Sequence, residues 1–378
     1  MQWSSSRGSP GSREPTRVAI IGCGAAVAGL HASALGKLES RGAARVVALV
    51  DPDRSRTAAL ARRFRSARPF VTAADALAST APALTIVASP PPLHAEHAVA
   101  ALTAGSHVLC EKPMAIRAAD AERMVAAAEA AERLLAIGMT RRMSTALLEA
   151  RALIGSGALG DGVRFAYRDG AVYDWPVSTS APFSRATAGG GALIDLGSHA
   201  IDYLSALFGR PSVTAYADDG QGEGVEANCV VDLAFPAATG FAQLSWSQPL
   251  VTGVHVVGAA AELRLNPYRP DLLLWRPRGG RWQARQTAVT LPRDAEPRPE
   301  RGVPRTYYEA IHYQLVQVLR AILHGEPVPV DGEQGLSAVR AIDACYRIAV
   351  PLRLPWLSAK EQALADERHW SRQRWLAA

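Results

Sequence analysis

Residues 17–31, RVAIIGCGAAVAGLH, decide the fold because they combine three signals of one supersecondary unit. A β-branched apolar run comes first, then the pattern Gly-x-Gly, then an Ala- and Leu-rich stretch of helical period. This order places Gly22 and Gly24 between a predicted strand and a predicted helix, where absent side chains let a pyrophosphate approach the backbone and the helix amino terminus. Gly22, Gly24, Ala25 and Ala26 are therefore candidate cofactor contacts.

The same alternation continues to about residue 138. Ala-rich stretches of helical period separate further apolar runs at 45–51 (RVVALVD), 84–89 (LTIVAS), 107–113 (HVLCEKP) and 134–139 (LLAIGM). This pattern predicts βαβ units and a parallel sheet, whose strands are apolar throughout because both faces are buried. We therefore predict a dinucleotide-binding domain over 16–138.

The texture changes in 139–378, which we predict to be a substrate-binding domain. After one helical stretch, strand-like segments follow one another through Gly, Pro and Asp clusters, which is typical of a largely antiparallel sheet. They lie at 163–170, 212–219, 226–235, 240–248, 254–259 and 261–265. Two late helices, near 306–324 and 333–349, are expected to cover this sheet.

Length and composition favour two globular domains without membrane or nucleic-acid partners. A chain of 378 residues is too long for one ordinary core, and no apolar run reaches bilayer-spanning length. Arginines in 269–305 alternate with Pro, Gly and apolar residues, which favours a solvated loop over a nucleic-acid surface, while anionic small molecules stay possible partners.

The cysteines and the amino terminus bear on the compartment. The four cysteines are scattered without a CxxC pair, so we predict neither a metal site nor a disulfide framework, and a reducing cytoplasm fits best. Residues 1–15 are polar and lack the apolar core of a secretory signal, which predicts a disordered tail.

Asp51 ends the second predicted strand at about the spacing from Gly24 at which an acidic side chain accepts hydrogen bonds from the adenosine ribose. Its carboxylate would repel a 2′-phosphate, so NAD is favoured as the cofactor. Arg54 is close enough in sequence to weaken that preference, so NADP remains an alternative. The competing interpretation is a turn Asp before a proline.

Glu111 and Lys112 follow another predicted strand, where open α/β sheets build their sites. Pro113 restricts the backbone of Lys112 and so fixes where the ammonium points. Desolvation is expected to lower the pKa of Lys112 toward the range useful for proton transfer. A solvated surface lysine is the alternative.

Residues 189–202, GGGALIDLGSHAID, place Asp195 and His199 four residues apart, hence on one face of a predicted helix. Histidine accepts an alcohol proton at neutral pH, and a nearby carboxylate would orient and tune the ring. We expect Gly189–Gly191 to let substrate and nicotinamide approach the backbone. A structural Asp with a buried His is the alternative for this stretch alone.

Together, GCGAAVAGLH, residues 89–115 (SPPPLHAEHAVAALTAGSHVLCEKPMA) and residues 189–209 (GGGALIDLGSHAIDYLSALFG) resemble the Gfo/Idh/MocA family of nicotinamide-dependent oxidoreductases. The resemblance spans Arg17 to about residue 350. It implies the fold class α/β, an N-terminal Rossmann domain plus a C-terminal α+β domain with a large, mainly antiparallel open sheet. In the family, the outer face of that sheet often packs against a second subunit, so a homodimer or homotetramer is expected.

The resemblance also implies roles for single residues. Lys112 resembles the lysine that hydrogen-bonds the reacting oxygen, and His199 and Asp195 resemble the pair that handles its proton, although family members differ in whether Lys or His is the base. We assign the base to His199. Ser89, Pro90 and His94 match the cofactor-facing loop. Glu111 and Lys112 complete the predicted cofactor contacts.

Candidate substrate contacts rest on position in the chain. The sequence suggests Arg141 and Arg142, Tyr173 and Trp175, and His312, because arginine forks and aromatic faces suit sugar hydroxyls. The resulting hypothesis is an NAD(H)-dependent dehydrogenase acting on a sugar, aminosugar or cyclitol, in secondary-metabolite biosynthesis. The alternatives are NAD-dependent glycoside cleavage through transient oxidation and a non-catalytic dinucleotide-sensing regulator.

Overall fold

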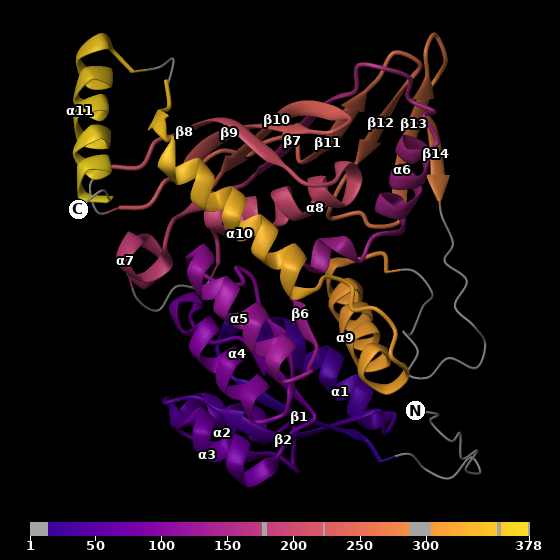
Figure 1. Ribbon diagram of the computed structural model, residues 1–378, viewed down its shortest axis with the longest axis vertical. Helices are drawn as coiled ribbons and strands as arrows, with labels where there is room; N and C mark the ends of the chain where they lie inside the picture. Colours follow the sequence, from indigo (N-terminus) through magenta and orange to yellow (C-terminus); the bar gives the residue numbers. More distant parts are fainter. Residues whose placement is uncertain (1–13, 176–179, 222–223, 287–303, 354–356, 377–378) are drawn as a thin grey trace.

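The computed structural model describes residues 14–175, 180–221, 224–286, 304–353 and 357–376. Residues 1–13 of the predicted tail and 287–303 of the arginine-containing segment lie outside these ranges. Two sheets, of six and nine strands, follow each other along the long axis of the molecule (Figure 1). Within the described part of the chain, every helix is too short or too polar to cross a bilayer.

The first sheet is parallel throughout and has the order β3–β2–β1–β4–β5–β6. Its strands are β1 (Thr16–Ile21), β2 (Ala44–Val50), β3 (Arg68–Phe70), β4 (Leu84–Val87), β5 (His107–Cys110) and β6 (Leu135–Ile137). The direction of progression reverses between β1 and β4, and a ligand crevice lies beyond the carboxyl ends of the strands at such a reversal. The predicted Rossmann fold is confirmed. The apolar pattern did not indicate β3, a three-residue edge strand that is largely exposed.

Helices cover both faces of the first sheet. They are α1 (Ala32–Ser40), α2 (Arg54–Ala61), α3 (Ala73–Thr80), α4 (His94–Thr103) and α5 (Ala118–Ala130). The helix after β1 contains a π-helical turn, Val27–His31, directly before α1. The short turn Pro91–Leu93 precedes α4.

The second sheet is mixed but mostly antiparallel, in the order β14–β13–β12–β11–β7–β10–β9–β8–β15. Its strands are β7 (Arg164–Gly170), β8 (Ser212–Asp218), β9 (Asn228–Phe235), β10 (Ala238–Ser245), β11 (Gly253–Val257), β12 (Ala261–Leu265), β13 (Leu272–Pro277), β14 (Gln283–Gln286) and β15 (Val350–Pro351). Among the described strands of this second sheet, only the pairs β7/β10 and β8/β15 are parallel. The mainly antiparallel sheet is therefore confirmed, with three strands, β13 to β15, that the sequence pattern did not indicate.

The remaining helices are α6 (Thr145–Gly155), α7 (Arg185–Ala188), α8 (Ser198–Phe208), α9 (Tyr307–His324), α10 (Gly332–Arg347) and α11 (Ala359–Leu376). The expectation that both late helices cover the antiparallel sheet is wrong for α9. This helix packs on α1 and adds Ile311, Leu315 and Leu319 to the core beneath the first sheet. An amphipathic pattern shows that one face is buried, but it does not show against which sheet.

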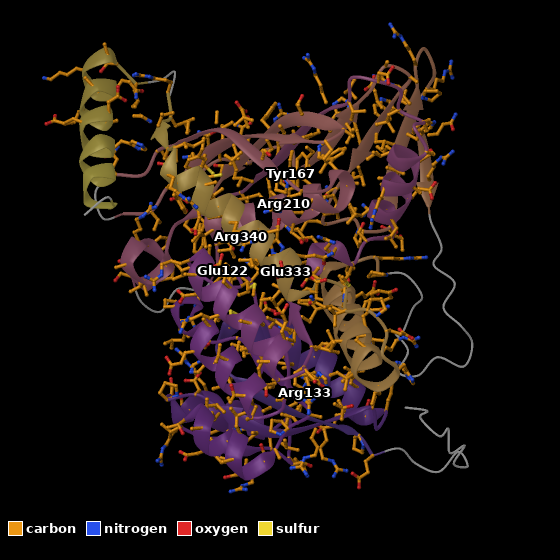
Figure 2. All side chains as sticks on the ribbon, in the orientation of Figure 1. Glu122, Arg133, Tyr167, Arg210, Glu333 and Arg340 are labelled. Carbon is orange, nitrogen blue, oxygen red and sulfur yellow. The ribbon has the colours of Figure 1, made fainter. Side chains whose placement is uncertain are left out.

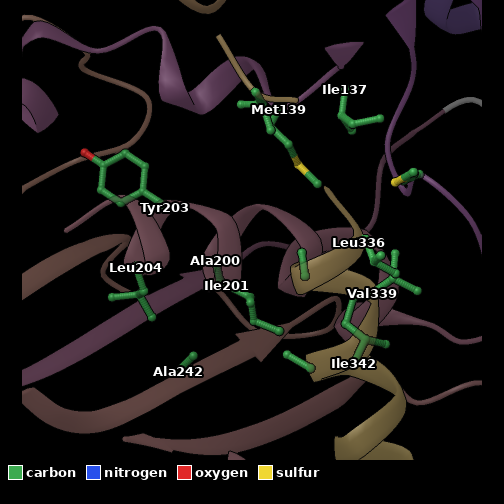
Figure 3. Packing of buried hydrophobic residues seen from close by; sticks show 14 of the residues in the cluster. Ile137, Met139, Ala200, Ile201, Tyr203, Leu204, Ala242, Leu336, Val339 and Ile342 are labelled. Carbon is green, nitrogen blue, oxygen red and sulfur yellow. The ribbon is translucent and has the colours of Figure 1, made fainter. Parts of the chain in front are cut away.

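One hydrophobic cluster runs through both halves of the molecule. It contains Ile137 of β6, Ile201 of α8 and Ile342 of α10, and Figure 3 shows α8 and α10 contributing neighbouring side chains to it. At its edge Arg340 of α10 forms an ion pair with Glu122 of α5, with 2.8 Å between nitrogen and oxygen (Figure 2). The two sheets are thus held at a fixed relative position by a continuous core.

Candidate functional site

The glycine loop lies at the carboxyl end of β1, against the end of β4. Gly22 has φ +91°, and a Cβ on it would overlap the Ala88 carbonyl, so only glycine fits there. The nearest atom to a Cβ on Gly24 would be Arg56 Nη1 at 3.9 Å, which leaves space for a ligand beside the backbone. Ala25 and Ala26 open the helix directly after this space. The two positions therefore require glycine for different reasons. At Gly22 a side chain would clash with the Ala88 backbone, whereas at Gly24 the missing side chain leaves space for a ligand.

Asp51 is buried at the end of β2, and its carboxylate is fixed by two backbone donors. Its Oδ2 accepts from the Cys23 N–H (2.8 Å) and its Oδ1 from the Asp53 N–H (2.9 Å). Each oxygen keeps a lone pair for a ribose hydroxyl. The arginine that approaches this carboxylate is Arg56, at 3.9 Å, whereas Arg54 is exposed at the start of α2. The sequence interpretation did not consider Arg56, and the effect of Arg54 on a 2′-phosphate stays a prediction.

The loop after β4 is tied to the loop after β5 by one histidine. His94 is 1% exposed, and its ring nitrogens lie 2.7 Å from the Ser89 carbonyl and 2.8 Å from the Pro113 carbonyl. The ring is thus committed to backbone, which replaces the expected cofactor contact by His94 with a positioning role. Ser89 is buried and Pro90 is exposed at the same loop.

Glu111 forms a buried pair that the sequence analysis missed. Its Oε1 lies 2.6 Å from Nε2 of His31, and its Oε2 accepts from the Lys112 N–H (3.2 Å). Burial alone would raise the pKa of Glu111, but the hydrogen bond from His31 and the charge of Lys112 outweigh it and hold the pKa below its usual value. His31 stands in the π-helical turn, eighty residues away in sequence. The pair thus fixes the loop that follows β5 against the helix that follows β1.

Lys112 and Asp195 form an ion pair that joins the two halves of the molecule. Lys112 Nζ donates to Asp195 Oδ1, and Trp246 Nε1 donates to Asp195 Oδ2 at 3.1 Å. Burial opposes the charge on Lys112, but the Asp195 carboxylate prevails and raises the pKa of Lys112. The expected lowering of this pKa is therefore wrong, because the carboxylate compensates for desolvation. Conversely, Lys112 and Trp246 hold the pKa of Asp195 below its usual value despite its burial.

His199 lies near this pair but is not bound to Asp195. Among the described residues, Asp195 accepts from Lys112 and Trp246, and Nδ1 of the 3%-exposed His199 has no hydrogen-bond partner. The expected carboxylate–imidazole pairing is wrong because Asp195 belongs to a π-helical turn, Leu193–Gly197, in which the i,i+4 alignment of an α-helix is lost. Burial, and then the charges of Arg141 and Lys112, hold the pKa of His199 well below its usual value.

The glycine run before Asp195 is in close contact with other segments of the same chain. A Cβ on Gly189 would overlap the Ile116 side chain, one on Gly190 the Tyr346 hydroxyl, and one on Gly191 the Glu226 carbonyl. Close packing thus explains the missing side chains, and the approach of substrate and nicotinamide to this run stays a prediction. Its absent side chains let three other segments of the chain close around the turn that carries Asp195.

The weaker substrate candidates differ in their contacts and in their exposure. Tyr173 packs on Trp246, with ring centroids 4.8 Å apart, while Trp175 is 45% exposed nearby in sequence. Arg142 is held by Asp202 through two 2.9 Å hydrogen bonds, so its fork is already occupied. His312 is buried within α9.

Arg141, which the sequence suggested as a substrate contact, is bound within the protein: its Nη1 donates to Tyr167 (2.6 Å) and Asp169 (2.5 Å). Its charge contributes to the lowered pKa of His199. Sequence reasoning missed Tyr167 and Asp169, and also Tyr307 and Trp246. Tyr307, at the start of α9, interacts electrostatically with Glu111 and Lys112. For Trp246 the only available signal was its place after an apolar strand. Within the described residues, no cluster of His, Cys, Asp or Glu has the arrangement of a metal site.

Comparison with known proteins identifies two family models in this chain. Residues 16–139 match the model for the Gfo/Idh/MocA oxidoreductase family, NAD-binding Rossmann fold, and residues 147–264 match the Gfo/Idh/MocA C-terminal domain. Together these segments cover more than half of the chain.

The chain is also similar to individual proteins. It is 32% identical over 219 residues to D-glucoside 3-dehydrogenase of Escherichia coli strain K12, which covers 57% of this chain and 60% of that protein. The match thus spans less than two thirds of this curated relative. Levoglucosan dehydrogenase in complex with NADH and levoglucosan has the same fold, with a TM-score of 0.75 at 21% identity over 88% of this chain and 96% of that chain. GenD2 from gentamicin A biosynthesis, in complex with NAD, has a TM-score of 0.70 at 28% identity over 91% and 97%.

Proposed function

Because this chain belongs to the Gfo/Idh/MocA family of oxidoreductases, we propose that it is an NAD(H)-dependent dehydrogenase or reductase acting on a secondary alcohol or ketone of a sugar, aminosugar or cyclitol. The observation that carries the proposal is the Lys112–Asp195 ion pair, which lies beyond the carboxyl end of β5 and reaches the second domain. A cation held at this edge of a dinucleotide-binding sheet is suited to a reacting oxygen.

The residues at the carboxyl edge of the first sheet fit NAD. The space beside Gly24 lies at a helix amino terminus, which suits a pyrophosphate, and the fixed Asp51 carboxylate suits ribose hydroxyls. When bound, the nicotinamide ring accepts or donates the hydride. Asp51 disfavours a 2′-phosphate, while Arg56 weakens that discrimination without reversing it, since its exposed guanidinium is 3.9 Å away.

Lys112 acts as a charged hydrogen-bond donor in this proposal. Its raised pKa keeps it an ammonium at neutral pH, so it stabilises an alkoxide better than it removes a proton. Asp195 and Trp246 hold the ammonium in place. His199, with a lowered pKa and an unpartnered Nδ1 among the described residues, is neutral and takes the hydroxyl proton. Glu111, Ser89 and Pro90 support the cofactor side, and Tyr173 and Trp175 the substrate side.

Relatives support the substrate class. The names D-glucoside 3-dehydrogenase and levoglucosan dehydrogenase both denote action on carbohydrates, and GenD2 belongs to gentamicin A biosynthesis. The last likeness, at 28% identity over nine tenths of the chain, supports an aminosugar or cyclitol substrate in secondary metabolism.

Three wider features belong to the same proposal. Residues 16–138 bind the dinucleotide and 139–378 bind the substrate. The outer face of the second sheet, where Phe241 and Val257 are partly exposed, pairs with a second subunit to form a homodimer or homotetramer. The four buried, free cysteines support a reducing, cytoplasmic location.

A substrate panel tests the function directly. Sugars, aminosugars and inositols are incubated with NAD⁺ or NADP⁺ while reduced-nicotinamide absorbance is followed, and the matching ketones are tested with NADH. We expect turnover with at least one class, faster with NAD. Failure of every alcohol and ketone would contradict the proposal, and cleavage of a glycoside without net NADH formation would favour transient oxidation instead.

A further inference from the structure

A cavity of about 950 Å³ is lined by residues at the amino-terminal ends of α4 and α5, in and beside helix α7, and at the carboxyl-terminal end of α10. Figure 1 shows the positions of these four helices. Lys112, Asp195 and His199 are absent from its lining. We propose that this cavity is a second binding site, which takes a small organic molecule through its phosphate or carboxylate group. The proposal rests on the cavity's own residues and does not require the proposed reaction.

The charge balance of the cavity favours an anion. Arg117, Arg185 and Arg347 line it together with two carboxylates, Asp120 and Asp343. Both carboxylates are already engaged. Asp120 binds Arg117 (3.2 Å) and another arginine outside the lining, and Asp343 Oδ2 accepts from the Ala118 N–H (2.9 Å) at the start of α5. Asp343 also interacts electrostatically with Arg347, whose Nε donates to the Asp343 carbonyl (3.3 Å). Arg185 is therefore the cation of the lining that forms no ion pair among the described residues.

Arg185 is the residue that points most directly to a ligand. It is 8% exposed, its guanidinium carbon lies 4.3 Å from the ring centroid of Tyr346, and its Nη1 is buried without a hydrogen-bond partner among the described residues. A buried charged donor without an acceptor is costly, whereas a guanidinium fork binds an oxyanion through two parallel hydrogen bonds. The Tyr346 hydroxyl donates to Glu226 (2.8 Å), so the surface on which Arg185 lies is itself fixed.

The rest of the lining indicates an organic ligand. Pro91, Pro92 and Ile116 form an apolar wall, and the volume is that of a small-molecule site. An inorganic ion would use the arginines alone and leave this wall without contact.

The cavity shares one segment with the candidate active site. The Arg185 carbonyl accepts from the Gly189 N–H (2.8 Å), and the Gly191 carbonyl accepts from the Asp195 N–H (3.0 Å). Gly189 itself lines the cavity, so a ligand on Arg185 would lie beside the segment that leads into the turn with Asp195.

Calorimetric titration tests the proposal without any need for turnover. The full-length protein is titrated with inorganic phosphate, glucose 6-phosphate and citrate at constant ionic strength, in the presence of excess NAD to fill the dinucleotide site. We expect saturable binding of an organic anion that weakens by roughly tenfold or more in Arg185→Gln, because the charge-assisted fork is lost. Arg185→Lys, which keeps the charge without the fork, should recover part of the affinity.

Two further variants separate binding from folding. Arg347→Gln changes an exposed arginine of the same cavity and should also weaken binding, whereas Arg65→Gln changes an exposed arginine of the first domain and should not. Equal affinity in the wild type, Arg185→Gln and Arg347→Gln, or no saturable binding of any probe, would overturn the site. Equal affinity for phosphate and both organic anions would overturn the assignment to an organic ligand.

Discussion

At the scale of single residues, the site depends on how one carboxylate divides its interactions. Asp195 accepts from Lys112 and from Trp246, and the result is a lysine that stays charged and a histidine that stays neutral. The half-buried Lys112 and the buried His199 thereby differ in protonation at neutral pH. In the proposed reaction, this difference suits Lys112 to stabilise an oxyanion and His199 to accept a proton, without a direct bond between Asp195 and His199.

Replacing Lys112 with methionine tests the first role. The Lys112→Met variant keeps the length of the side chain but removes the charge, so we expect kcat to fall by about two to three orders of magnitude while the dissociation constant for NAD changes little. Steady-state kinetics and fluorescence titration measure the two quantities. The exposed Lys360→Met serves as the matched control. Full turnover by Lys112→Met would remove Lys112 from the reaction.

The pH dependence of stability tests the state of His199. Its pKa is lowered in the folded protein, so the unfolded chain binds a proton more readily, and the stabilisation from the neutral ring is present above the unfolded pKa of about 6.5 and is lost as the pH falls below it. We therefore expect the free energy of unfolding of the wild type, relative to His199→Gln, to decrease from about pH 7 to pH 5. Urea denaturation at each pH measures this difference. A difference that does not vary with pH would mean that His199 titrates normally.

Local patterns in the sequence predicted some of these residues. The others could not be predicted, because their partners lie far away in the sequence. Gly22, Asp51, Lys112 and Asp195 each stand beside a recognisable strand end or glycine run. Trp246 and His31 do not, because their partners lie 51 and 80 residues away and are brought near only by tertiary packing. The protonation of Lys112 was mispredicted for the same reason, since its partner carboxylate belongs to the other domain.

At the scale of elements, the run Gly189–Gly191 and the turn after it form one packed unit. Glu226 Oε1 accepts from the Gly191 N–H (2.9 Å), the Leu193 N–H (3.1 Å) and the Tyr346 hydroxyl (2.8 Å). A buried carboxylate thus satisfies the free donors at the start of the turn. A Cβ on Gly190 would overlap the Tyr346 hydroxyl that binds this carboxylate, and one on Gly191 would overlap the Glu226 backbone.

Gly190→Ala tests this packing. Its Cβ would overlap the Tyr346 hydroxyl, so we expect destabilisation by about 1–3 kcal/mol, the range for overpacking a filled interior. Gly29→Ala is the control, because an added Cβ on Gly29, in the turn Val27–His31, has no atom within 4 Å, whereas one on Gly190 overlaps a side chain. Chemical denaturation measures both variants. If the two lost the same stability, close packing would not be the reason for the glycine.

Elements were predictable from sequence in proportion to their length and burial. The long apolar strands β1, β2 and β9 followed from their composition, whereas β3 and β14 are short strands at sheet edges and carry little pattern. Helix α9 was located along the chain within about one residue, yet its packing partner was not predictable.

At the scale of the whole molecule, the two domains are distinct in their sheets but continuous in their core. The hydrophobic cluster that includes Ile137, Ile201 and Ile342 leaves neither domain a separate interior. Interfaces between independent domains are usually smaller and more polar. The ion pair between Lys112 and Asp195 consequently lies across a junction that does not open without exposing apolar surface.

We expect the chain to unfold in a single cooperative transition. Seven of the eight tryptophans lie beyond residue 139, so their fluorescence reports on the second domain, while NAD contacts the first. Because the core is shared, excess NAD should raise the midpoint of the tryptophan transition, by about 2.7 kcal/mol of stability at a hundredfold excess over the dissociation constant. Calorimetry and fluorescence melting check this. Two resolved transitions, with only one shifted by NAD, would show that the domains unfold independently.

The two π-helical turns, Val27–His31 and Leu193–Gly197, suggest how this protein can be re-engineered by deletion. A π turn holds one residue more than an α turn, so removing a single residue from 193–197 would convert it to regular helix and rotate the preceding backbone by about 100° relative to α8. Asp195 would then face a different neighbour, whereas His199 would keep its position. Deletion of a single residue is therefore expected to separate Asp195 from Lys112 in the candidate site.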